Sequence, residues 1–296
     1  MHLKNRFDVG EFVMMVELAP PKGIDLSRIV SVAEKLRGKV AAAVVPDMTA
    51  AVMRMSALGG AMILQNKGLE TVMQVCCRDR NRLAIQADLL AAYGCGISNV
   101  MVVKGEDITF GDHHQAKAVN DLTRQGLLET VHKMAQGKDL AGAELAGAPK
   151  FYCGSAVNVG VSGADLDNEL YRMEREAEAG VRFFITSPVF DPDAIAPFME
   201  KVDLRKTNIV ATVMLFKSIG MARYIQRNMP HIHVPDALIN RFQRAADKPR
   251  EAVRIANETI DNLREHGFKG VMIQPMGWEE KLPEIVERSV APATVH

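Results

Sequence analysis

The stretch TVMQVCCRDRNRLAIQADLLAAYGCGISNVMVVKG, residues 71–105, decides the fold because it places one helical pattern between two apolar runs. The runs at 71–77 and 99–105 are almost continuously apolar, as parallel strands covered on both faces should be. Between them, residues 80–93 carry apolar side chains at helical spacing and stop at Gly94, a residue type expected just after a last helical turn. The stretch therefore predicts a strand, a helix and a second, parallel strand.

The same alternation of strand and helix recurs along the whole chain. Further helical patterns cover residues 25–37, 166–179 and 252–266, and a glycine follows each of them. Eight alternations favour an α/β fold of the (β/α)8 TIM-barrel type over a doubly wound sheet. We expect one barrel domain over residues 1–296, with an extra helix around 234–244 between the seventh and eighth strands. The eight predicted strands are residues 12–19, 40–45, 71–77, 99–105, 151–158, 181–187, 208–215 and 270–276.

The composition excludes several classes of protein. Apolar residues make up 48% of the 296 residues, enough for a large core. Acidic and basic residues number 36 each, and this balance argues against nucleic acid or an anionic membrane as a partner, since both reward a basic excess. No window approaches 18 continuous apolar residues, and the N-terminus lacks an apolar signal core. We expect a cytoplasmic protein.

The residue types that bind metals do not form a pattern that predicts a metal site. No two cysteines have C-x-x-C spacing, so buried, reduced thiols are expected. His113 and His114 are neighbours in a predicted loop, and adjacent side chains rarely reach one ion together, which favours hydrogen bonding or ligand contact. Neither G-x-G-x-x-G nor G-x-x-x-x-G-K-[ST] is present, so no dinucleotide is held in Rossmann or P-loop fashion. The cysteines are Cys76, Cys77, Cys95 and Cys153.

Glu17 is a carboxylate inside an otherwise apolar predicted strand, near its C-terminal end. In a barrel of this type the active site lies at the C-terminal ends of the strands. Burial raises the pKa of a carboxyl group toward a range useful for a general acid. An ion pair with Arg or Lys at the barrel mouth is an equally strong interpretation.

The block RDRN, residues 78–81, follows the third predicted strand with two arginines, an aspartate and an asparagine. It could clamp a carboxylate or a phosphate. A charge network at the start of the next helix, with Asp79 as the capping residue, is the interpretation that the chemistry favours.

At these strand ends the sequence resembles the methylenetetrahydrofolate reductase family, and most closely the short bacterial and acetogen-type flavoprotein subunits. The likeness covers almost the whole chain, and the block CRDRNR with the following QADLLAAY is its most specific part. The stretches that carry it are VELAPPKG (16–23), DMTAAVMRMSALG (47–59), VMQVCCRDRNRLAIQADLLAAYGCGISNVMVVKG (72–105), FGDHHQAK (110–117), AGVRFFITSPVFD (179–191) and VPDALINRF (234–242).

The resemblance implies an oxidoreductase with FAD in a (β/α)8 barrel. Such enzymes pass a hydride from NAD(P)H, or from an electron-delivering partner, through the flavin to 5,10-methylenetetrahydrofolate and form 5-methyltetrahydrofolate. Glu17 matches the family's general acid, which protonates N10 of the folate, and Glu106 matches the carboxylate beside the flavin.

The resemblance also implies two sets of binding residues. A tetrahydrofolate-type small molecule is the expected partner, and the likeness leaves open a homo-oligomer or an electron-transfer partner subunit. The expected flavin-binding residues are Lys104, Gly105, Asp107, His113, Asn158, Arg172 and Arg175. The expected folate-binding residues are Asp47, Gln74, Ser187, Lys217 and Gln274.

The sequence departs from the family pattern at several flavin-side and folate-side positions. Pro46 stands in place of Thr, Glu106 in place of Asp, and Ser187 in place of Gln. Glu176 stands in place of a Lys that helps to hold the flavin phosphates, and Arg172, one turn earlier, is a candidate to compensate. Two alternatives therefore stay open: a flavin-less relative that binds a folate one-carbon carrier, for one-carbon transfer or direct hydride transfer, and a non-catalytic subunit of an electron-transfer complex.

Overall fold

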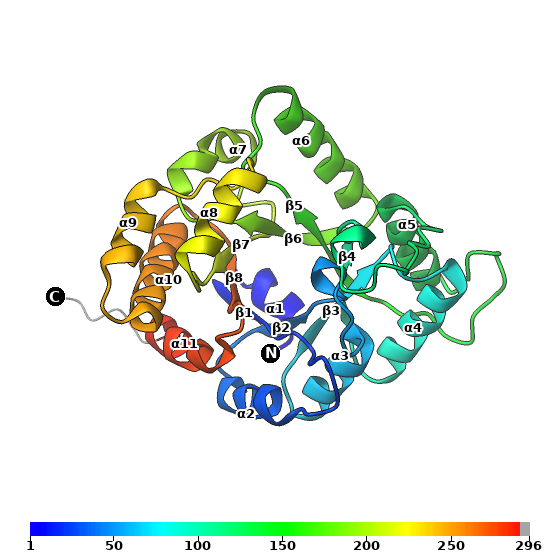
Figure 1. Cartoon of the computed structure of the whole chain (residues 1–296). Coiled ribbons are helices and arrows are strands. Elements are labelled where there is room, and N and C mark those ends of the chain that lie inside the picture. Colours follow the sequence, from blue (N-terminus) through cyan, green and yellow to red (C-terminus); the bar gives the residue numbers. More distant parts are fainter. Residues whose placement is uncertain (291–296) are drawn as a thin grey trace.

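Eight parallel strands close into a barrel in which each strand pairs with the next and β8 pairs with β1. The computed structural model describes residues 1–290, and Figure 1 shows the ring of strands surrounded by helices. This confirms the prediction of a (β/α)8 barrel and the position of every predicted strand. The strands are β1 (Val13–Glu17), β2 (Ala42–Val45), β3 (Thr71–Cys76), β4 (Asn99–Val103), β5 (Tyr152–Val157), β6 (Val181–Pro188), β7 (Ile209–Met214) and β8 (Gly270–Gln274).

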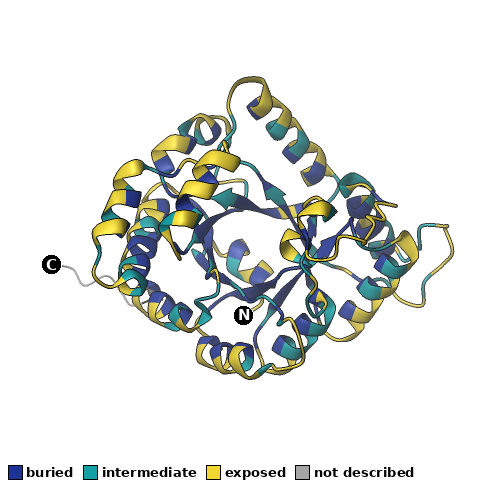
Figure 2. Ribbon diagram, viewed as in Figure 1, coloured by how far each residue is buried: buried dark blue, intermediate teal, exposed yellow. Residues whose placement is uncertain are grey.

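Successive residues of each strand point alternately into the barrel and toward the helices. In β1, Val13 and Met15 belong to the apolar cluster inside the barrel, whereas Met14 and Val16 belong to the cluster between strands and helices. Side chains on both faces are buried, which explains the apolar runs in the sequence. Figure 2 shows the same division, with buried residues on the strands and on the inner sides of the helices.

The helices cover the outside of the barrel, and the extra helix between β7 and β8 is confirmed as α9 (Asp236–Arg244). It packs in a separate apolar cluster that includes Phe216 and Phe242, whose ring centroids lie 5.9 Å apart. The other outer helices are α2 (Ser27–Leu36), α3 (Ala57–Asn66), α4 (Arg82–Gly94), α5 (Arg124–Ala135), α6 (Gly163–Glu178), α7 (Ala196–Lys201), α8 (Ile219–Asn228), α10 (Lys248–Glu265) and α11 (Leu282–Val290).

Both expected boundaries of α4 were wrong, for local reasons. Gly94 is still helical, and Gly96 takes the left-handed conformation, with φ +83°, that turns the chain toward β4. At the other end Asn81, not Asp79, is the cap, because its side-chain oxygen accepts hydrogen bonds from the N–H groups of Leu83 and Ala84 at 3.1 and 3.0 Å.

A short N-terminal helix, α1 (Leu3–Asp8), closes the end of the barrel where the strands begin. Figure 1 shows it inside the ring of strands. Leu3 and Phe7 are buried in the inner apolar cluster, and the Phe7 ring lies 6.0 Å from that of Phe183. The helix α1 therefore plugs the barrel axis at this end, and a site inside the barrel can open only at the opposite end.

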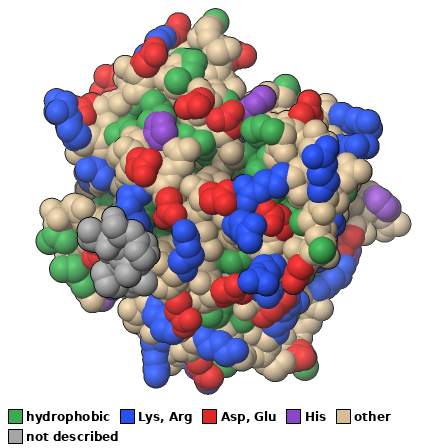
Figure 3. Space-filling model, turned by 90° about the vertical axis from the view of Figure 1, so that its left-hand side faces the viewer, with side chains coloured by type: hydrophobic (Ala, Val, Ile, Leu, Met, Phe, Trp, Pro, Cys, Tyr) green, Lys and Arg blue, Asp and Glu red, His purple; other side chains and the backbone are tan. Residues whose placement is uncertain are grey.

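Two surface properties bear on the class of protein. Within residues 1–290 no helix is long and apolar enough to cross a membrane. On the face shown in Figure 3, acidic and basic side chains are interspersed, in keeping with a net charge of zero.

Candidate functional site at the barrel mouth

A cavity of about 510 Å³ lies at the C-terminal ends of the strands. This volume falls in the range that proteins use for small-molecule ligands, roughly 300–1,000 Å³. Ten of the fourteen residues expected at the site line it. They are Glu17, Asp47, Gln74, Lys104, Gly105, Glu106, Asn158, Arg172, Ser187 and Gln274.

The strand register explains why polar side chains meet here. In three strands the last apolar residue that points into the barrel is followed, two residues nearer the mouth, by a polar residue that points the same way. Met15 is followed two residues later by Glu17, Ile185 by Ser187, and Met272 by Gln274. Because alternate residues of a strand share a face, the polar residues continue the inward rows and form one polar layer above the apolar interior.

Glu17 lies in this polar layer without a cationic partner among residues 1–290. Both of its carboxylate oxygens accept hydrogen bonds from Gln274 Nε2, at 3.2 and 3.3 Å. Burial raises the pKa of Glu17 to about 7, because it outweighs the hydrogen bond from Gln274 and the more distant charge of Arg54, which lower the pKa. The geometry therefore supports the general-acid interpretation over the ion-pair interpretation.

Asp47 also lines the cavity but has a different environment. Its Oδ2 accepts a hydrogen bond from Cys76 N at 3.0 Å and pairs with Arg80, which in turn contacts Asp88 at 2.9 Å. Burial raises the pKa of Asp47, and the charge of Arg80 opposes that shift. Asp47 is thus a buried, paired carboxylate beside an unpaired one.

The RDRN block forms a charge network behind the cavity, as the favoured interpretation predicted. The guanidinium of Arg78 is nearly inaccessible and binds the Asp79 carboxylate through two hydrogen bonds of 2.7 Å. It also donates to the carbonyl oxygens of Met48 at 3.0 Å and Glu106 at 3.1 Å. One buried cation therefore ties together the loops that follow β2 and β4.

A second charge network lies in the cavity wall that α5 and α6 form. Glu176, only 3% exposed, lies 3.0 Å from Arg124 Nε and 2.7 Å from Arg172 Nη1. Arg172 also contacts Glu169 and donates to the Ala156 carbonyl oxygen at 2.9 Å. Arg172 Nη1 is buried against the Glu176 carboxylate, which neutralises it within the wall. Arg124 and Arg172 therefore line the cavity with their charges balanced by Glu169 and Glu176.

Four residues expected at the site lie elsewhere. Asp107 instead caps a short 3₁₀ turn, η2 (Ile108–Phe110), and hydrogen bonds from Thr109 lower its pKa. His113 lies in the outer loop, 2.9 Å from Asp112. Arg175 is exposed on α6, and Lys217 lies beside Gly277 in the loops after β7 and β8. None of the four lines the cavity.

The candidate metal ligands are dispersed in the described residues 1–290, where no three His, Cys, Asp or Glu side chains are close enough to hold an ion. All four cysteines are free thiols. Three are buried as expected, but Cys95 is exposed because it lies just beyond the end of α4. Burial raises the pKa of Cys76 to about 11, so this thiol beside the cavity is neutral near pH 7.

Two cavity residues, Thr49 and Arg124, were not among the residues expected to bind a ligand. Thr49 reaches the cavity from a loop in which Met48, Ala50 and Ala51 all take positive φ values between 51° and 57°. Residues other than glycine rarely adopt this conformation, and such strain is concentrated at functional sites. Arg124 comes from the start of α5, distant from any strand end, so the strand pattern could not identify it.

Comparisons with known proteins agree with this architecture. Residues 2–290 match the family profile described as methylenetetrahydrofolate reductase. A search of curated proteins finds no match.

Two solved structures share the fold at low sequence identity. One is an uncharacterized protein from Clostridium thermocellum that binds two copies of 5-methyl-5,6,7,8-tetrahydrofolic acid; its TM-score is 0.65, its identity 14%, and the match covers 97% of this chain and 98% of that one. The other is a phosphoenolpyruvate phosphomutase from Streptomyces platensis subsp. rosaceus, with a TM-score of 0.51, 15% identity, and coverage of 96% and 84%.

The raised pKa of Glu17 predicts a pH-dependent contribution to stability. Between pH 4.5, the ordinary pKa, and about pH 7, the folded protein holds a proton that the unfolded chain has lost. Raising the pH through this window therefore lowers the free energy of unfolding. Urea titrations of the wild type and of Glu17→Gln should show this loss in the wild type only. The exposed Glu284→Gln variant should behave like the wild type, and equal pH dependence in all three proteins would contradict the assignment.

Proposed function

This chain belongs to the methylenetetrahydrofolate reductase family, and we propose that it reduces 5,10-methylenetetrahydrofolate to 5-methyltetrahydrofolate at the barrel mouth. The observation that carries the proposal is Glu17, a carboxyl group with a pKa of about 7, no cationic partner in residues 1–290 and direct access to the cavity. The neighbour that binds 5-methyl-5,6,7,8-tetrahydrofolic acid supports a reduced folate as a ligand for this fold.

Glu17 supplies the proton that activates the folate. Protonation of N10 weakens the bond between N10 and the methylene carbon, and the five-membered ring opens to an iminium between that carbon and N5. Addition of a hydride to the carbon then gives the methyl group, so the substrate gains one proton and one hydride. A carboxyl group with a pKa near 7 can both hold and release a proton at neutral pH, which suits a general acid.

The other polar residues of the layer position the reacting groups. Gln274 donates to both oxygens of Glu17 and so fixes the carboxyl group at the cavity. Gln74, Asn158 and Ser187 face the same space, and Ser187 Oγ donates to Asn158 Oδ1 at 3.3 Å. Amide and hydroxyl groups of this kind can pair with the alternating donors and acceptors of a pterin ring.

The residues around the α5–α6 wall fit an FAD phosphate. Arg172 and Lys104 both line the cavity, and Lys104 has no ion pair within the described residues. From the sequence, Glu176 was expected to repel the flavin phosphates. In the structure it does not line the cavity but forms ion pairs with Arg124 and Arg172 and so orients both. Arg172 is therefore the candidate for the compensating cation, and Lys104, Gly105 and Asn158 line the same cavity. When bound, a reduced flavin supplies the hydride.

A second candidate function follows from the acidic partners of the same arginines. Glu169 and Glu176 already neutralise Arg124 and Arg172, which lowers the attraction for a pyrophosphate. A relative without flavin would bind the folate and accept a hydride directly from a dihydronicotinamide, or would carry the one-carbon unit without reducing it. A partner subunit that delivers electrons stays a prediction for either candidate.

Removing the acid of Glu17 tests the reduction itself. The Glu17→Gln variant keeps the shape and a hydrogen bond to Gln274 but has no proton to donate. We expect turnover to fall by about 10²–10⁴-fold, with the affinity for 5-methyltetrahydrofolate changed less than about threefold. The exposed Glu284→Gln variant is the control and should retain full activity. Unchanged turnover in Glu17→Gln would show that the proton comes from another group.

Two arginines on one helix separate the flavin-dependent candidate from the flavin-less one. The purified protein should be yellow, and Arg172→Ala should lower the affinity for FAD by about tenfold or more, because a charged hydrogen-bond donor is lost. Arg175→Ala removes an exposed guanidinium outside the cavity and should leave FAD affinity unchanged. A colourless protein that takes up no added FAD, yet binds 5-methyltetrahydrofolate, would establish the second candidate.

A further inference from the structure

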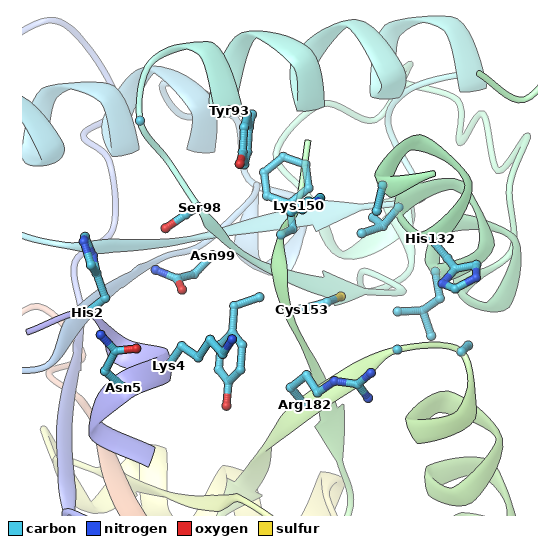
Figure 4. A pocket seen from close by; sticks show the side chains of 18 residues that line it. His2, Lys4, Asn5, Tyr93, Ser98, Asn99, His132, Lys150, Cys153 and Arg182 are labelled. Carbon is cyan, nitrogen blue, oxygen red and sulfur yellow. The ribbon is translucent and has the colours of Figure 1, made fainter. Parts of the chain in front are cut away.

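A second and larger cavity, of about 760 Å³, lies at the opposite end of the barrel, where the strands begin. Its walls include Asn99, Tyr152 and Arg182, which are the first or second residues of β4, β5 and β6. Lys4 and Asn5 of α1 form another side, and Figure 4 shows these side chains around one common space. The proposed reaction at the mouth makes no use of this cavity.

This cavity is lined by basic side chains and by no carboxylate. Its 18 lining residues include Lys4, Lys150 and Arg182 but no Asp or Glu. None of these three cations has an ion pair within residues 1–290, and Arg182 donates only to the carbonyl oxygens of Ala177 and Val181, at 3.3 and 3.2 Å. Glu70 is not a lining residue, but its carboxylate lies 3.4 Å from His2 Nδ1 and accepts a hydrogen bond from Asn99 Nδ2 at 2.9 Å, so negative charge borders the cavity on the side of His2. Three unpaired cations around one cavity attract an anion with more than one negative charge.

The remaining wall is aromatic and apolar. Tyr93, 39% exposed, packs edge to face against Phe151 with ring centroids 5.3 Å apart. Tyr152 is held in place by stacking on Phe183 at 5.4 Å, and Leu128 and Val131 of α5 complete the apolar side. Rings held in this way form a surface on which a flat heterocycle can stack.

From this arrangement we infer a second ligand site that takes a nucleoside phosphate. The base would pack against Tyr93 and Phe151, and the phosphates would lie among Lys4, Lys150 and Arg182. Ser98 adds a hydroxyl group for the sugar or the base. Because Lys4 belongs to α1, a bound ligand would also fasten this helix to the barrel and stabilise the folded protein.

Calorimetric titration with ADP, pyrophosphate and adenosine tests the site. We expect ADP to bind more tightly than either fragment, because the cavity offers both a charged and an aromatic part. Lys150→Ala and Arg182→Ala should each weaken ADP binding by about tenfold. Lys138→Ala, which removes an exposed lysine outside the cavity, is the matched control and should bind ADP as the wild type does.

The variants also locate the ligand. Loss of ADP binding in Arg172→Ala, with binding kept in Lys150→Ala and Arg182→Ala, would place ADP at the barrel mouth and overturn the proposal. Equal affinity for ADP and pyrophosphate would overturn the nucleoside part, and no binding of ADP at all would overturn the site. Failure of the mouth chemistry in Glu17→Gln leaves ADP binding unaffected, so the two proposals fail separately.

Discussion

Gln274 donates two hydrogen bonds to the carboxyl group of Glu17 at the height in the barrel where the apolar interior ends and the cavity at the mouth begins. Closure of eight strands forces alternate residues inward, and below this level they form an apolar cluster that includes Met15, Ile185 and Met272. A carboxyl group placed one step higher is buried enough to prefer its neutral form but still reaches the cavity. The barrel thus determines both where the acid lies and how readily it holds a proton.

Buried charge networks hold the loops around this acid. Arg78 ties the backbone after β2 to the backbone after β4, and Glu176 holds Arg124 and Arg172 on the α5–α6 wall. Each network pairs its charges, as burial requires, since an unpaired buried ion costs several kcal/mol. In residues 1–290, Glu17 has no cation in these networks, whereas Asp47 pairs with Arg80. Glu17 can therefore hold a proton near neutral pH and act as an acid.

Much of this was predictable from sequence, and the failures have physical causes. Apolar runs identified all eight strands, and the residues at their ends, such as Gln74 and Ser187, line the cavity because strand periodicity continues through them. Beyond the strand ends no periodicity constrains the loops, so Asp107 turned out to cap a turn and His113 to lie outside. The basic cavity joins Lys4, Lys150 and Arg182 from distant segments, and only the closed barrel brings them together.

The pH dependence of hydride addition reports on the protonation of Glu17 during the reaction. In single-turnover experiments with pre-reduced protein, the rate should be constant below about pH 7 and fall tenfold per pH unit above it, because only protonated Glu17 can open the folate ring. The residual rate of Glu17→Gln should lack this transition. A wild-type rate that does not change between about pH 6 and about pH 9 would contradict the account, because no group with the pKa of Glu17 would then control the reaction.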